Sequence, residues 1–176
     1  MTEFSADVTY FDDHKLLQSS GRIFVANDSI REERKSSDSE VIRITDMFRG
    51  IAYVLEPGSK EYYQQEALAV PRDPARFCAE MMLLECGYRG EKEIDGRVTE
   101  HWSAELGFGD LSIGVSAWYD PTIQYPVRIE LNDGAALQLS NIQIARPPSS
   151  LFSIPYNYRM VEQTDSDQSA GFPEWP

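Results

Sequence analysis

The chain has 176 residues and a formal net charge of -13, from 16 Lys and Arg against 29 Asp and Glu. That length suits one domain with a substantial core. Nucleic-acid phosphates and anionic membrane surfaces are bound by clusters of Lys and Arg, and the sequence has no such cluster, so neither is an expected partner. No stretch approaches the ~20 apolar residues of a membrane-spanning helix, so no transmembrane segment is expected either.

The first third of the chain reads as strands joined by short turns. Apolar and polar residues alternate, which is typical of strands with one dry face. Asn27-Asp28-Ser29 and Pro57-Gly58-Ser59 are favourable turn sequences. The strands predicted here cover residues 4–11, 21–27, 30–35, 41–47, 50–56 and 60–65.

A single helix-like tract interrupts the strands. Asp73 is a good N-cap and Pro74 suits the first helical position. Phe77, Met81 and Leu84 share one face at helical spacing, and Gly87 can end the helix. The pattern predicts a helix over about 74–84.

Alternation returns after the helix. In the segment 98–106 the face of Val98, Trp102 and Ala104 is predicted to turn to the core, and His101 away from it. Asn132-Asp133-Gly134 predicts a tight hairpin turn, and a slip in the alternation between Leu139 and Ile142 predicts a bulge. The later strands cover residues 88–93, 98–106, 111–119, 126–131 and 135–144, and a short helical turn is expected at about 149–152.

Sequential strands with short turns predict a mainly β (α+β) fold, an antiparallel up-and-down sheet that curls into a closed barrel or an open half-barrel. Residues 1–161 are expected to form one domain. Residues 162–176 are polar, without periodicity, and are expected to form a flexible tail.

The two cysteines leave two alternatives. In an unbroken helix, Cys78 and Cys86 would lie about 12 Å apart along the axis, at about 1.5 Å per residue. A disulfide needs Cα atoms within roughly 7 Å. Either the helix is whole and both thiols are free, or it stops near Met82 and the chain folds back to close a short loop.

The sequence contains few residues or motifs that are typical of a catalytic site. His14 and His101 are the only histidines, and His101 follows Glu100 in a strand, so the two side chains point to opposite faces. No nucleophile elbow, zinc-protease motif or phosphate-binding glycine loop occurs. The acidic runs lack the spacing of a calcium loop. We therefore expect no enzyme, no cofactor and no metal.

Several short motifs occur along residues 4–158. They are the opening Phe4-Ser5-Ala6-Asp7, Gly21-Arg22-Ile23-Phe24, then Cys78, Cys86, Gly90, Glu93, Gly96-Arg97, Thr99 and Trp102, and finally Leu151-Phe152-Ser153-Ile154-Pro155-Tyr156-Asn157-Tyr158. Together they resemble a family of small secreted bacterial proteins whose fold is similar to that of the LolA-type periplasmic lipoprotein carriers and the related stress sensor RseB.

The resemblance implies an open half-barrel wrapped around its helices, with the helix at 74–84 and the turn at 149–152 against the concave face. It also implies export, with Met1 replacing a signal peptide, hence a periplasmic or secreted location and a Cys78–Cys86 disulfide. The carriers hold acyl chains in an apolar cavity. The residues that could line such a cavity here are Phe24, Tyr53, Met81, Trp102 and Val115.

Two functions remain open. The first is a binding or carrier module for an apolar ligand, such as a lipid or lipoprotein acyl chain. The second is an interaction or sensor domain of the cell envelope, in which the same aromatic side chains fill the core and a protein partner binds elsewhere. Cavity volume is the property that separates the two.

Overall fold

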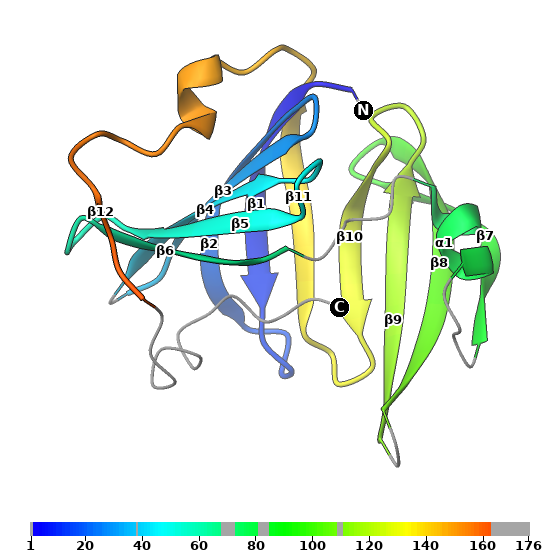
Figure 1. Cartoon of the computed structure of the whole chain (residues 1–176). Coiled ribbons are helices and arrows are strands. Elements are labelled where there is room, and N and C mark those ends of the chain that lie inside the picture. The colour runs from blue at the N-terminus through cyan, green and yellow to red at the C-terminus, as the bar shows by residue number, and fades with distance from the viewer. Residues whose placement is uncertain (1, 38, 68–72, 81–84, 109–110, 163–176) are drawn as a thin grey trace.

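Most of the described residues belong to one β-sheet (Figure 1). The computed structural model describes residues 2–37, 39–67, 73–80, 85–108 and 111–162. Its helices are α1 (Pro74–Glu80) and the 3-10 turn η1 (Ser149–Phe152). Its strands are β1 (Phe4–Phe11), β2 (Leu17–Ala26), β3 (Ser29–Lys35), β4 (Glu40–Asp46), β5 (Ile51–Glu56), β6 (Glu61–Glu66), β7 (Glu85–Ile94), β8 (Arg97–Phe108), β9 (Leu111–Asp120), β10 (Tyr125–Leu131), β11 (Ala136–Gln143) and β12 (Arg159–Met160).

The sheet has 12 strands in the order β12-β6-β5-β4-β3-β2-β1-β11-β10-β9-β8-β7. The first strand therefore lies in the middle, between β2 and β11, and the sheet does not close because β12 and β7 are its edges. Only the two-residue strand β12 pairs in parallel, with β6. The predicted antiparallel, mainly β half-barrel is confirmed.

The strand register separates two faces, and we name them from β1. The inner face carries Phe4 and Val8, whose side chains are buried, and the outer face carries Asp7. The inner-face cluster draws on β1, β2, β3, β10 and β11. Trp118 pairs with Arg128 and His101 on the outer face. The buried members of the cluster are Phe4, Ala6, Val8, Tyr10, Ile23, Val25, Ile30, Trp118, Ile123, Tyr125, Val127, Leu137 and Leu139.

Electrostatic coupling across the interior shows that the inner face is concave. Burial raises the pKa of the Tyr125 hydroxyl on β10, and the carboxylate of Glu32 on β3 raises it further. In a flat sheet these strands would lie about 19 Å apart, four spacings of ~4.8 Å. The sheet therefore curls so that the inner sides of β3 and β10 face each other.

The predicted turns and bulge are confirmed. Asn27 closes the β2–β3 hairpin with φ 50°, and Gly134, with φ 101°, closes the β10–β11 hairpin. The register of β1 against β11 shifts opposite Asn141, whose φ is 51°. Asn141 donates to the Asp7 carboxylate, which fixes this bulge.

The segment after β11 is placed differently from the prediction. The helical turn forms at residues 149–152 as expected, but it lies against β3 on the outer side, where Arg31 donates to the Leu151 carbonyl oxygen. Ile154 and Tyr158 then pack on the outer-face cluster of Ile42, Ile44 and Leu55. β12 then pairs with the edge of β6. Because β4 and β5 bury apolar residues on both faces, the outer face there also needs a cover.

Candidate functional site

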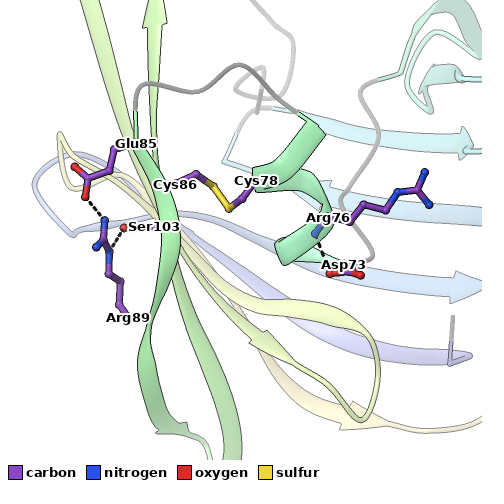
Figure 2. The surroundings of a disulfide bond; sticks show 7 residues. All are labelled: Asp73, Arg76, Cys78, Glu85, Cys86, Arg89 and Ser103. Atoms are coloured by element: carbon purple, nitrogen blue, oxygen red, sulfur yellow. Dashed lines mark hydrogen bonds and ion pairs between the residues drawn. A yellow bond between two sulfur atoms is a disulfide. The ribbon is translucent and has the colours of Figure 1, made fainter.

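A disulfide attaches α1 to the edge strand β7 (Figure 2). The Cα atoms of Cys78 and Cys86 are 5.4 Å apart, and the described residues contain no free cysteine. The chain thus folds back after the helix, which decides between the two alternatives left by the sequence. The Asp73 carboxylate accepts from the Arg76 amide, as expected of an N-cap. Helix residues predicted beyond Glu80, including Met81, lie outside the described residues.

The helix lies on the inner face. Cys86 pairs with Ala104 on β8, and Trp102 lies two residues away on the same face. Burial raises the pKa of the Tyr119 hydroxyl to about 12, with further contributions from Asp73 and Glu100. Asp73 therefore lies near the inner side of β9. The predicted position of the helix against the concave face agrees with these contacts.

The residues predicted to line a cavity do not share a face. Trp102 and Val115 lie on the inner face, in register with Ala117 and Ala104. Phe24 and Tyr53 lie on the outer face, opposite Arg31 and Ile44 respectively. Phe24 is buried under the guanidinium of Arg22, 5.0 Å from its ring centroid. These four side chains therefore cannot line one cavity.

The open edge of the inner face presents apolar surface. Tyr88 and Val98 keep 50% and 62% of their surface exposed. Trp102 pairs with Tyr88 across β7 and β8, and the two rings meet edge to face at 5.6 Å, whereas Val98 lies four residues from Trp102 along β8, beyond Glu100. The indole N–H of Trp102 donates to Glu100. Together Tyr88, Val98 and Trp102 form what we call the edge strip.

Charged side chains stand on the inner face of β3 and β4. Glu32 pairs with Ile23 on one side and Arg43 on the other, in the middle of a ladder that continues to Val54 and Tyr63. Burial raises the pKa of Glu32, and the guanidinium groups of Arg43 and Arg34 lower it. We call Glu32, Arg34 and Arg43 the inner charged cluster. The run Arg31-Glu32-Glu33-Arg34-Lys35 is charged on both faces, so its alternation does not show which charges lie inside.

The outer face holds an open groove of about 670 Å³ over β7 to β10. At one end His101 stacks on Trp118, with ring centroids 4.7 Å apart and planes 3° apart. Burial lowers the pKa of His101, and Lys92 and Arg89 lower it further. Arg89 donates to Ser103 and pairs with Glu85 (Figure 2). His101 does point away from Trp102, as predicted, but it packs on an aromatic ring.

Two further features bear on metals and membranes. In the described part of the chain, no group of three or more His, Cys, Asp and Glu side chains could hold a metal ion. Within the same residues, no helix has the length and apolar character needed to cross a membrane.

Comparisons with known proteins identify the fold. No protein-family model matches the chain, and no curated protein is similar to it in sequence. An uncharacterised conserved protein from Thermus thermophilus superposes with a TM-score of 0.61 at 11% identity, over 92% of this chain and 91% of that one. PNGF-II has a TM-score of 0.59 at 8% identity, covering 97% of this chain and 33% of PNGF-II.

MucB of Pseudomonas aeruginosa, in its complex with MucA, superposes with a TM-score of 0.55 at 18% identity. The match covers 89% of this chain and 57% of MucB, so this chain spans little more than half of that protein. At such identities the likeness concerns the fold alone. It is the half-barrel that the sequence motifs indicated, and the chain has the LolA/RseB-like fold.

Proposed function

We propose that this chain is a non-enzymatic binding domain of the bacterial cell envelope, which carries an apolar ligand such as a lipid or lipoprotein acyl chain in the half-barrel. The edge strip carries this proposal. A sheet that served only as a scaffold would bury its inner apolar side chains, whereas Val98 and Tyr88 stay exposed near the open edge, Tyr88 being two residues from the disulfide that holds α1. An acyl chain entering there would bury methylenes at about 0.8 kcal/mol each.

The disulfide supports an envelope location, because disulfides persist in oxidising compartments. It also holds α1 beside the edge strip, which gives an apolar ligand a second wall. Burial of apolar surface needs no catalytic group.

The test is titration with a fluorescent fatty acid, together with native mass spectrometry of protein purified from the periplasm. One saturable site and a co-purified lipid are expected. The double substitution Tyr88→Asp and Val98→Asp should weaken binding at least tenfold, and Val115→Trp should block it by narrowing the inner face. Phe48→Asp is the matched control, because Phe48 is 86% exposed in the β4–β5 turn, away from the strip.

A second candidate is an interaction domain with a closed interior. The tightly buried side chains at the centre of the inner face favour it. Phe4, Val25 and Leu139 have between 0% and 1% of their surface exposed. A side chain that lined an empty acyl-chain cavity would keep surface that a water-sized molecule could reach. MucB, which shares the fold, is known in complex with the protein MucA. Absence of fatty-acid binding, with no co-purified lipid, would support this candidate.

A further inference from the structure

The inner charged cluster occupies a position that is normally apolar. β3 has four strands between it and the edge on the β12 side and seven on the other. Its inner residues are Ile30, Glu32 and Arg34, whereas the inner residues of β1 are Phe4, Ala6, Val8 and Tyr10. Buried charge costs several kcal/mol per ion unless it is compensated, so charged residues at such positions need an explanation.

The cluster contains a buried donor that lacks a hydrogen-bond partner among the described residues. Glu32 and Arg43 are cross-strand neighbours, but they form no ion pair with each other. The Nε of Arg43 is buried without a hydrogen-bond partner in the described part of the chain. Arg34 is different, because it donates to Ser19 and Gln18 and its guanidinium lies 4.5 Å from the ring centroid of Tyr10.

Glu32 and Arg43 lie deep in the half-barrel and still reach open space. Glu32 influences Tyr10 on β1 and Tyr125 on β10, so it lies between the two sides of the curled sheet. Both side chains nevertheless remain only half-buried. Both side chains therefore keep surface on the inner face that a ligand could contact. The apolar residues Ile23 and Val54, 2% and 4% exposed, flank them in the ladder.

The charges of the inner charged cluster favour an anion. Two guanidinium groups stand against one carboxyl group, which gives a local excess of positive charge in a chain of net charge -13. Burial favours the protonated form of Glu32, and a protonated carboxyl group can donate a hydrogen bond to an anionic oxygen. A guanidinium presents planar, paired donors that match a carboxylate or a phosphate.

We propose that the inner charged cluster is a head-group site, in which Arg43 binds the carboxylate or phosphate of a single-chain anionic amphiphile while its tail lies along the apolar inner face. This inference rests on the proposed function and adds the chemical class of the ligand. Arg43 supplies the positive charge that pairs with the head group, and protonated Glu32 can donate a hydrogen bond to it. Arg34 is held in place by Ser19 and Gln18.

The experiment compares dodecanoate with dodecanol by calorimetric titration of the intact chain. Wild-type protein should bind dodecanoate at least tenfold more tightly. Arg43→Gln should remove that preference and leave dodecanol binding unchanged, and Arg43→Lys should restore part of it. Arg22→Gln is the matched control, because Arg22 lies on the outer face of β2 beside Asp7. Circular dichroism and the melting temperature check that each variant is folded.

The outcomes separate the inference from the proposed function. If both amphiphiles bind equally well, or if Arg43→Gln binds dodecanoate like the wild type, the head-group site is wrong and the carrier stands. If neither amphiphile binds, the carrier function is itself wrong and the inference falls with it. Competition by acetate as strong as that of dodecanoate would mean a site for small anions, and would overturn the role of the tail. Dodecyl phosphate in place of dodecanoate identifies which anionic group is preferred.

Discussion

The first and third strands differ in what they place on the same inner face. β1 presents Phe4 and Val8, which have 0% and 1% of their surface exposed. β3, two positions away in the sheet, presents Glu32 and Arg34, which are half-buried and charged. Their backbones are equivalent, because both are central antiparallel strands. The difference indicates that β1 stabilises the half-barrel and that β3 gives its interior a polar site.

Truncation of a buried side chain at the centre of the inner face should have the largest effect on stability. Phe4→Ala removes a fully buried ring that packs edge to face on Tyr125 at 5.5 Å, and it should lower the free energy of unfolding by about 3–5 kcal/mol. Chemical denaturation measures this change. A loss below ~1 kcal/mol would mean that the inner side chains of β1 are not tightly packed. β1 would then not differ from β3 in its contribution to stability.

Removal of the disulfide should have the next largest effect. Closing the short loop between Cys78 and Cys86 contributes about 2–3 kcal/mol by the chain-entropy relation. The double variant Cys78→Ser and Cys86→Ser should lose that amount, and the peptide bond after Arg76, within the released helix α1, should become more sensitive to trypsin. Unchanged proteolysis would show that packing on β7, without the bridge, is enough to hold α1.

Neutralising the inner charged cluster should have a small effect on stability. The double variant Glu32→Gln and Arg43→Gln should change the free energy of unfolding by less than ~1 kcal/mol, because the two half-buried side chains form no ion pair with each other that the substitutions would remove. The same variant should lose the preference for anionic amphiphiles. A loss of several kcal/mol with unchanged binding would instead make β3 a structural strand like β1.

The smallest expected effect concerns His101 on the outer face. Its pKa is lowered from 6.5, so the folded state binds a proton less readily than the unfolded state. The titration of His101 should contribute nothing to stability well above pH 6.5. As the pH drops from there through the lowered pKa, the free energy of unfolding should fall. The melting temperatures of the wild type and of His101→Gln, plotted against pH between about 8 and 5, should differ in slope only in that window. Parallel curves would show that the stack on Trp118 tolerates the imidazolium.

Local sequence determined the strands, the turns and the bulge. The alternation in residues 4–11 defines a dry face, and Asn132-Asp133-Gly134 permits the positive φ that its hairpin turn requires. These features depend on neighbours within a few residues, so they can be predicted before any tertiary contact is known. The sequence motifs also indicated the half-barrel fold, and through it the disulfide between Cys78 and Cys86.

Only the tertiary structure decided which apolar face of each strand points into the half-barrel. Phe24 and Trp102 both lie in alternating strands, yet the register places them on opposite sides of the sheet. Glu32 comes within electrostatic reach of Tyr125 because the sheet curls across four strand spacings. Strand order, register and curvature arise from pairings between residues far apart in the chain, and alternation within one strand carries no information about them.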